Sequence, residues 1–148
     1  MEINQLLNEK LILLDLQSTN KLDAISEMAE VLYKEGKLFD KACYLQAVLK
    51  REEEFSTGIG MGIATPHGKS SAVKEAALVF AKSKFGVDFA SIDGNPAYLF
   101  FLIAVPEEAN NTHLRILSEL SRRLMHEDVR KKLSEVNTTS EVITLFSE

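Results

Sequence analysis

The sequence predicts a single α/β domain. Patterns typical of amphipathic helices stand before, between and after short apolar runs rich in β-forming residues, and this alternation is characteristic of α/β proteins. The chain has 148 residues, close to the common size of one domain, and we find no repeat, linker or low-complexity tract in it. We therefore expect residues 1–148 to form one domain.

The first expected element is a strand. The run KLILLDLQ, residues 10–17, is short and dominated by Leu and Ile, although a buried helical turn would show a similar pattern. A helix is then expected between Asn20, one of three candidate N-caps with Ser18 and Thr19, and Gly36, which can end it. Its apolar side chains recur at three- and four-residue steps: Leu22, Ile25, Met28, Ala29, Leu32 and Tyr33.

A second helix is expected after Asp40, whose side chain can cap it. The charged end of this helix, residues 50–54, leads into a glycine-rich stretch. We expect its inner face to consist of Ala42, Leu45, Val48 and Leu49.

Two further strands are expected in the second half of the chain. AALVFAKS (76–83) and AYLFFLIAV (97–105) are apolar runs bounded by glycine and proline, and the second is so continuous that it should be buried in the sheet. Turn signals at 93–96, Asp-Gly and Asn-Pro, separate the two runs.

Three helices are expected after the last strand. A short one lies around Val129 and Leu133, and the final one is opened by a capping box formed by Thr138 and Glu141. The first and longest has leucines along one face: Leu114, Leu117, Leu120 and Leu124.

Composition excludes several classes of function. Seventeen basic against 22 acidic residues give a formal net charge of −5, which argues against a nucleic acid partner. Cys43 is the single cysteine, so we expect no disulfide, a reducing cytoplasmic location and a place for this side chain in the core. No segment approaches the ~20 apolar residues of a membrane-spanning helix, and the first residues do not resemble a signal peptide.

The stretch GIGMGIATPHGKS, residues 58–70, gathers four glycines around His67. Gly68-Lys69-Ser70 matches the end of a Walker A motif, but the glycine required five places earlier is Ile63, and a proline at 66 removes an amide from the loop. The glycines at 58, 60 and 62 fit G-x-G-x-G, which is not a dinucleotide fingerprint. A nucleotide loop is therefore disfavoured.

Two other kinds of site can be built on this histidine. His67, His113 and His126 lie far apart in sequence and offer no third sure ligand with the right spacing, so we expect no metal. A hydrolase triad would need His67 and a nearby serine, and the chain has no G-x-S-x-G elbow, which leaves hydrolysis as a weaker alternative. The candidate serines are Ser56, Ser70 and Ser71.

The chemistry of imidazole favours phosphoryl transfer. A neutral histidine is a nucleophile that can carry a phosphoryl group on one ring nitrogen. Because transfer requires in-line approach of two proteins, we expect His67 on an exposed, stiffly held rim, with room supplied by the four glycines and a backbone fixed by Pro66.

Two further residues are suited to stabilise the negative charge of the phosphoryl group. His113 lies at the expected start of a helix, where the field favours an anion and a neutral ring that donates one N–H. Arg51 is the arginine nearest to the glycines in sequence and can hold phosphate oxygens with two donors. We interpret His126 as a solvated residue between two helices.

Three blocks of the sequence resemble the signature of a known family. REEEFSTGIGMGIATPHG, GVDFASIDGNPAYLFFLIAVPEE and HLRILSELSRRL are similar to the enzyme IIA component (type 2) of the fructose/mannitol class of the bacterial phosphoenolpyruvate-dependent sugar phosphotransferase system. The resemblance spans roughly residues 2–147. It implies a central mixed, mostly parallel β-sheet of about five strands flanked by helices on both faces.

The resemblance also implies a phosphoryl relay without cofactor or metal. The phosphocarrier protein HPr donates, a cysteine of the IIB component accepts, and the membrane component IIC takes part only indirectly. His67 corresponds to the phosphorylated histidine, His113 to the second active-site histidine and Arg51 to the arginine that supports the phosphate. Thr65 departs from the apolar residue that is common before the Pro-His-Gly triplet, which affects only local packing.

A second branch of proteins shares this fold and triplet. Nitrogen-regulatory proteins bind partners according to their phosphorylation state and do not feed a transporter, so they are the alternative. The segments LIAVPEE and HLRILSELSRRL are more similar to the transporter-linked branch. The sugar is selected by the IIC component and does not follow from this sequence.

Overall fold

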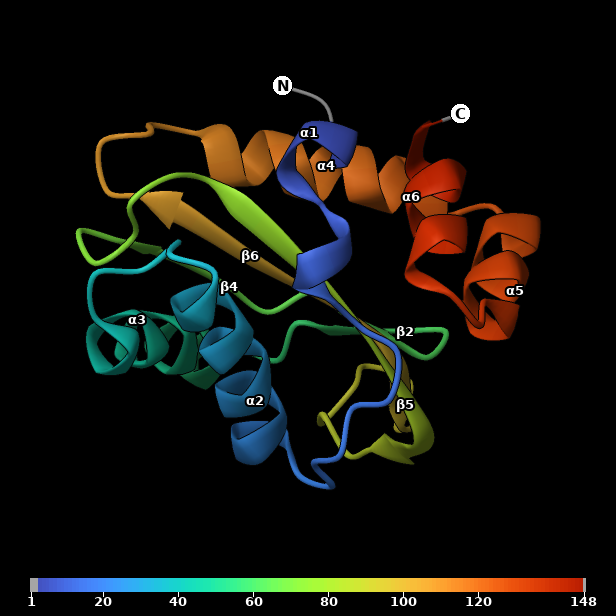
Figure 1. Cartoon of the computed structure of the whole chain (residues 1–148). Coiled ribbons are helices and arrows are strands. Elements are labelled where there is room, and N and C mark those ends of the chain that lie inside the picture. The colour runs from blue at the N-terminus through green and yellow to red at the C-terminus, as the bar shows by residue number, and fades with distance from the viewer. Residues whose placement is uncertain (1–2, 148) are drawn as a thin grey trace.

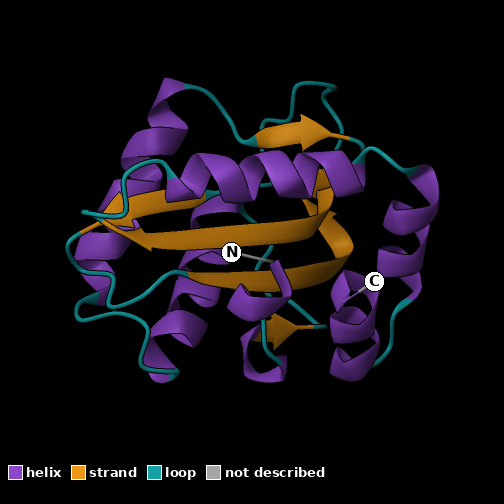
Figure 2. Cartoon of the chain, turned by 90° about the horizontal axis from the view of Figure 1, so that it is seen from above, coloured by secondary structure: helices purple, strands orange, loops and turns teal. Residues whose placement is uncertain are grey.

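The computed structural model describes residues 3–147 and consists of one mixed β-sheet between two layers of helices (Figures 1 and 2). This confirms the α/β class and the helices on both faces of the sheet. The strands are β1 (Ile12–Leu13), β2 (Gly58–Gly60), β3 (Ile63–Ala64), β4 (His67–Ser70), β5 (Ala77–Val87) and β6 (Ala97–Pro106).

The order of the strands is β1-β5-β6-β3-β2, and β4 also pairs with β6. β3 and β4 follow one another along the same edge of β6, opposite 99–100 and 103–106. Three of the five pairings are parallel, and the longest, β5 with β6, is antiparallel. The mixed sheet is confirmed with six strands, because the glycine-rich stretch contributes three short ones.

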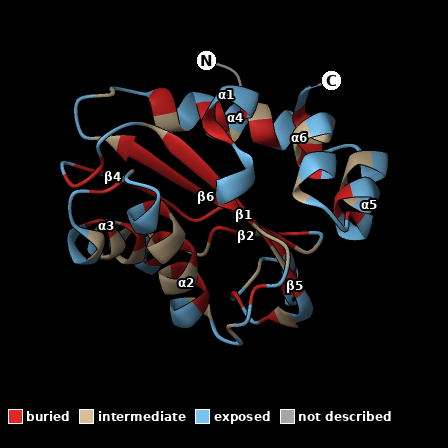
Figure 3. Ribbon diagram, in the orientation of Figure 1, coloured by how far each residue is buried: buried red, intermediate tan, exposed pale blue. Residues whose placement is uncertain are grey.

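The two helical layers cover opposite faces of the sheet. Side chains of β5 and β6 alternate between them, so Val79 and Phe100 face one layer while Phe80 and Phe101 face the other. Buried residues consequently form one cluster on each side of the sheet, and the outer helix faces are exposed (Figure 3). None of the helices within 3–147 is long and apolar enough to cross a membrane.

One layer contains α2 (Lys21–Lys34) and α3 (Lys41–Glu54). The other lies above the sheet in Figure 1, and Figure 2 looks down on its longest helix. It contains α1 (Ile3–Leu6), α4 (Thr112–Leu124), α5 (Glu127–Glu135) and α6 (Thr139–Ser147), and a 3-10 turn at Glu9–Leu11 leads into β1.

The helix ends follow the predicted caps. Asn20 accepts a hydrogen bond from the Asp23 amide and begins α2, and Asp40 caps α3 through the Cys43 amide. At α6 the Thr138 hydroxyl accepts from the amide of Glu141, as the capping box predicts. Side-chain oxygens thus satisfy amides that have no partner inside the helix.

Several predicted helix faces are wrong in detail. In α3 the buried stripe is Tyr44, Val48 and Glu52, at four-residue steps, so Cys43 points to solvent and the expectation of a core cysteine is wrong. The charged residue Glu52 at an inward position hid the end of this stripe from the sequence pattern. The other residues expected to face inward that are exposed are Leu22, Tyr33, Ala42 and Leu114.

Candidate functional site

His67 is the first residue of β4 and pairs with Ile103 of β6. Its side chain is buried, with 8% of the residue exposed, so the expectation of an exposed rim is wrong. On the opposite face of β4 the helix α3 approaches closely, since a Cβ on Gly68 would lie 2.8 Å from the Val48 Cγ2 atom. Tyr44 of α3 donates a hydrogen bond to the Ile103 carbonyl oxygen at 2.8 Å and so ties that helix to the strand beside His67.

The glycines near His67 serve packing and turns rather than space around the imidazole. A Cβ on Gly58 would lie 2.5 Å from the Ser91 Oγ atom, which brings β2 against the loop before β6. Gly60 has a φ of +91°, a conformation that other residues rarely adopt. The interpretation that the four glycines clear room for a phosphoryl group is therefore wrong.

Thr65 determines which nitrogen of His67 carries the proton. The Nδ1 atom lies 3.0 Å from the Thr65 carbonyl oxygen, and a carbonyl can only accept, so Nδ1 is protonated and Nε2 of the neutral ring keeps its lone pair. Burial lowers the pKa of His67, and the charge of Arg51 lowers it further, against the Thr65 hydrogen bond and the carboxylates of Glu52 and Glu54. The ring is therefore neutral at pH 7 and available as a nucleophile.

His113 lies beside His67 although 45 residues separate them in the chain. The ring centroids are 6.0 Å apart and the ring planes differ by 28°. Desolvation lowers the pKa of His113, and the charges of His67 and Lys69 lower it further, so this ring is also neutral. Its buried Nδ1 atom has no hydrogen-bond partner among residues 3–147.

Arg51 lies in the last turn of α3, and its charge acts on His67. Its Nη1 donates to the Phe55 carbonyl oxygen at 2.9 Å, and the guanidinium lies over the Phe55 ring with Cζ 4.6 Å from the centroid. A guanidinium has five N–H donors, so this anchored group keeps donors that the Phe55 carbonyl does not use. The structure thus brings together His67, His113 and Arg51, the three residues predicted for the site.

Sequence reasoning missed Lys69 as a cation of this site. Lys69 stands two residues after His67 in β4, and its Nζ donates to the Asn110 carbonyl oxygen at 2.9 Å. Asn110 has a φ of +53° and lies just before α4, so this bond holds the segment that presents His113. The alternation of a strand, which places residues i and i+2 on one face, is the signal that could have indicated Lys69.

Two of the three serines offered for a hydrolase, Ser56 and Ser70, are bonded elsewhere, and Ser71 is exposed. Ser56 donates to the Phe89 carbonyl oxygen, and the Ser70 hydroxyl accepts from the Ala72 amide. A triad histidine is oriented by a carboxylate, whereas Nδ1 of His67 bonds a backbone carbonyl. Residues 3–147 also contain no group of three or more His, Cys, Asp or Glu side chains placed to hold a metal ion.

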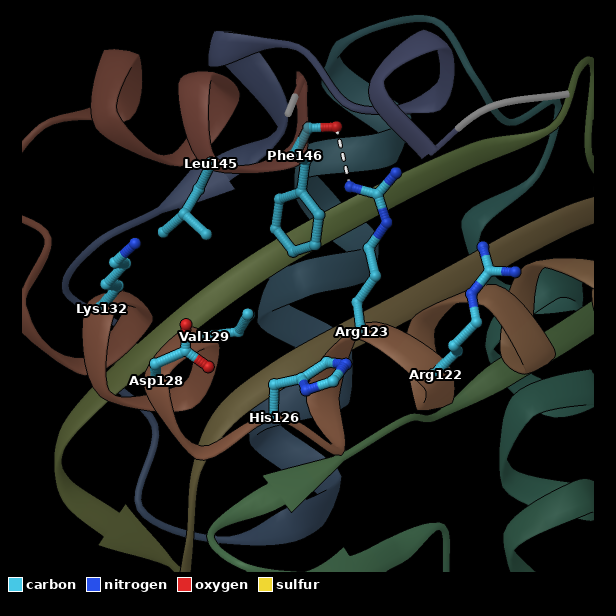
Figure 4. Close-up of a pocket in the computed structure, with 8 residues that line it drawn as sticks. All are labelled: Arg122, Arg123, His126, Asp128, Val129, Lys132, Leu145 and Phe146. Carbon is cyan, nitrogen blue, oxygen red and sulfur yellow. Dashed lines mark hydrogen bonds between the residues drawn. The ribbon is translucent and has the colours of Figure 1, made fainter.

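His126 is separate from this site. It lines a pocket formed by α4, α5 and α6, together with Arg122, Arg123 and Phe146 (Figure 4). Arg123 donates to the Phe146 carbonyl oxygen and to Glu119, so its guanidinium holds the helices together. The interpretation of His126 as a solvated residue between two helices is confirmed, since it is exposed between α4 and α5.

Residues 5–148 match the family described as the phosphoenolpyruvate-dependent sugar phosphotransferase system, EIIA 2. The chain is 47% identical over 148 residues to the fructose-specific EIIABC component of Bacillus subtilis, and it spans only 23% of the length of that relative. It is 42% identical to the fructose-specific EIIA component of Haloferax volcanii, over 94% of this chain and 90% of that protein.

Solved structures agree with this fold. The nitrogen regulatory protein IIA-Ntr from Neisseria meningitidis superposes with a TM-score of 0.90 at 33% identity, covering 97% of this chain and 98% of that one. A complex of enzyme IIA-Mtl with phosphorylated enzyme IIB-Mtl from Escherichia coli matches with a TM-score of 0.83 at 29% identity, covering 95% and 96%.

Proposed function

Because this chain belongs to the EIIA 2 family of the phosphoenolpyruvate-dependent sugar phosphotransferase system, we propose that it is a phosphoryl carrier that takes the group on Nε2 of His67. The observation that carries this proposal is the hydrogen bond between Nδ1 and the Thr65 carbonyl oxygen, which leaves Nε2 as the basic nitrogen. The neutral His113 ring beside it adds a hydrogen-bond donor without adding a competing positive charge.

The transfer consists of two displacements at phosphorus. Nε2 of His67 attacks the phosphorus of a phosphohistidine on HPr, a new N–P bond forms, and the old bond breaks with its electron pair returning to the donor ring. A cysteine thiolate of a IIB component then attacks the same phosphorus, and Nε2 leaves with its pair. Arg51 and a ring N–H of His113 stabilise the charge on the phosphoryl oxygens in both steps.

The partners in this proposal come from relatives. The solved complex pairs enzyme IIA-Mtl with phosphorylated enzyme IIB-Mtl, and the Bacillus subtilis relative carries EIIA, EIIB and EIIC together. We propose a IIB component as acceptor, HPr as donor and the cytoplasm as location; the single cysteine of the chain is consistent with a reducing compartment. We expect no direct contact with the membrane component.

The sequence identities favour a fructose-specific carrier over a nitrogen-regulatory role. The fructose-specific relatives are 47% and 42% identical to this chain, against 34% for the nitrogen regulatory protein of Bradyrhizobium diazoefficiens. The TM-score of 0.90 with IIA-Ntr is the observation that keeps a regulatory role as the second candidate. Fold similarity does not separate the two roles, since one fold can host both.

The decisive experiment is intact mass spectrometry after incubation with phosphoenolpyruvate, enzyme I and HPr. We expect one acid-labile phosphoryl group, which disappears when a fructose-class IIB is added. A protein that stays unmodified under these conditions contradicts the carrier. A protein that is phosphorylated, passes nothing to any IIB and binds partners differently in its two states belongs to the regulatory branch.

A further inference from the structure

Glu52 is a buried carboxylate beside the site, and the transfer scheme gives it no task. Its side chain is 4% exposed, and its Oε1 atom lies 2.7 Å from the Nζ atom of Lys21 on the neighbouring helix α2. Lys21 in turn lies over the Phe89 ring, 4.7 Å from its centroid. Burying a charge is costly unless it is paired and hydrogen-bonded, so the position of this carboxylate calls for an explanation.

Both oxygens of Glu52 are bonded to the same residue, Thr57. The Thr57 amide donates to Oε1 at 3.1 Å, and the Thr57 hydroxyl donates to Oε2. Thr57 stands between the end of α3 and Gly58, the first residue of β2. Glu52 therefore fixes both the backbone and the side chain of the residue that leads into the glycine-rich stretch.

Thr57 passes this constraint to the residue that holds His67. Its carbonyl oxygen accepts from the Thr65 amide at 3.0 Å and faces the Thr65 hydroxyl at 3.5 Å. The Thr65 carbonyl oxygen then accepts from Nδ1 of His67 at 3.0 Å. The resulting chain of contacts is Lys21, Glu52, Thr57, Thr65 and His67.

The pairing of β2 with β3 ends one residue before Thr65 and is short, whereas β3 and β4 on either side of Thr65 pair with β6. β2 and β3 share two register pairs, Gly58 with Ala64 and Gly60 with Ile63, and the register shifts between them. Such bulged, glycine-containing pairs are locally weak. The hydrogen bond between Thr57 and Thr65 extends the pairing of β2 and β3 by one residue on each strand, and Glu52 holds the Thr57 side of this bond.

We propose that Glu52, held by Lys21, is a positioning residue that keeps the Thr65 carbonyl against Nδ1 of His67 and so keeps Nε2 as the reactive nitrogen. The reactive role of Nε2 rests on the proposed function, whereas the choice of ring tautomer does not. Glu52 itself does not touch the phosphoryl group in this scheme.

The chain offers a matched control for the charge of Glu52. Glu54, two residues later, is exposed, and its charge also acts on His67, but no hydrogen bond links it to Thr57. Among the other charged or titratable groups, Arg51 from α3 acts on His67, while His67 itself and Lys69 from β4 act on His113. Glu54→Gln therefore removes one negative charge from the same helix end and leaves the chain of contacts intact.

The test compares Glu52→Gln with Glu54→Gln in the full chain. Two-bond 1H–15N correlation spectra of the unphosphorylated proteins, recorded above the pKa of His67, report which ring nitrogen is protonated. We expect the wild type and Glu54→Gln to show Nδ1–H, and Glu52→Gln to show a mixture with Nε2–H. Single-turnover transfer from phosphorylated HPr should slow on the order of tenfold in Glu52→Gln, as for other residues that orient a reacting ring.

Each outcome decides the proposal. A Glu52→Gln protein that keeps wild-type Nδ1–H spectra, or one whose tautomer shifts no more than that of Glu54→Gln, overturns it. If Glu52→Gln does not fold, Thr57→Val removes only the hydroxyl that bonds Glu52 and should move the tautomer in the same direction; an unchanged tautomer in Thr57→Val then overturns the proposal. A wild type that accepts no phosphoryl group contradicts the carrier function, while the spectra still decide the role of Glu52.

Discussion

The surroundings of His67 and of His126 differ in how far each ring is buried and in what its neighbours bond to. His67 is buried, its Nδ1 is bonded to a backbone carbonyl, and a second imidazole lies 6.0 Å away. His126 is exposed, and Arg123, which lines the same pocket, donates to the Phe146 carbonyl oxygen (Figure 4). Arg123 also donates to Glu119. A histidine close to arginines is thus not by itself a functional site. A site also needs a histidine ring with a fixed tautomer and neighbouring donors that are not used in other bonds.

The largest expected effect comes from deleting each histidine in turn. His67→Ala should abolish phosphorylation by HPr because it removes the nucleophile, whereas His126→Ala should be phosphorylated at the wild-type rate. Intact mass after the relay reaction measures both, and circular dichroism confirms that each variant is folded. Retained phosphorylation in His67→Ala, or its loss in a folded His126→Ala, would reverse the comparison.

The next largest difference in transfer rate is expected between replacing an arginine near His67 and replacing an arginine near His126. Arg51→Met should slow transfer by about 100-fold, the usual cost of removing a donor that stabilises developing charge. Arg122→Met is the matched control, because the Arg122 side chain is 73% exposed and lies in the other pocket. Rapid-quench transfer from phosphorylated HPr measures both rates, and an Arg51→Met protein within twofold of wild type removes the proposed role of this cation.

The second ring of the site should matter less than the arginine. His113→Ala removes one neutral donor and keeps the nucleophile, so we expect transfer to slow roughly tenfold without stopping, since a hydrogen bond to a charged group contributes about 1.5 kcal/mol or more. The same rapid-quench assay tests this variant. A His113→Ala protein as fast as the wild type would show that the close approach of the two rings has no function in transfer.

The sequence indicated the scaffold better than the region around His67. β6 occupies 97–106 against a prediction of 97–105, since a continuous apolar run has few other solutions, and caps such as Asn20 act over three residues. The burial of His67 could not be predicted, because it depends on segments distant in the chain, such as the one that carries His113. Contacts between distant segments leave no local pattern.

Some residues of the site could be recognised from the sequence, and others could not. His67, His113 and Arg51 stand out by residue type and by their place in family-like blocks, and the structure brings them together. Glu52 does not stand out, because it begins a run of three identical carboxylates. Only the direction of the last turn of α3 distinguishes the buried Glu52 from its exposed neighbours, and that direction is set by Tyr44 and Val48 further back on the same stripe.

The smallest expected effect is a dependence of stability on pH that comes from the rings of His67 and His113. The pKa values of His67 and His113 are lowered in the folded protein, chiefly by burial, so below about pH 6.5 the unfolded chain binds protons that the folded one does not. Stability from this source is therefore complete above the unfolded pKa and is lost as the pH falls below it.

Urea unfolding of the wild type and of a His67→Gln, His113→Gln double variant measures this contribution. The difference between the midpoints of the two proteins reports the contribution of these two rings, because the rest of the sequence is the same. We expect the wild type to lose more stability than the variant between pH 7 and pH 5. Equal losses in the wild type and the double variant would mean that the rings of His67 and His113 bind a proton as readily in the folded protein as in the unfolded chain. The neutral nucleophile on which the transfer scheme depends would then have no support from burial.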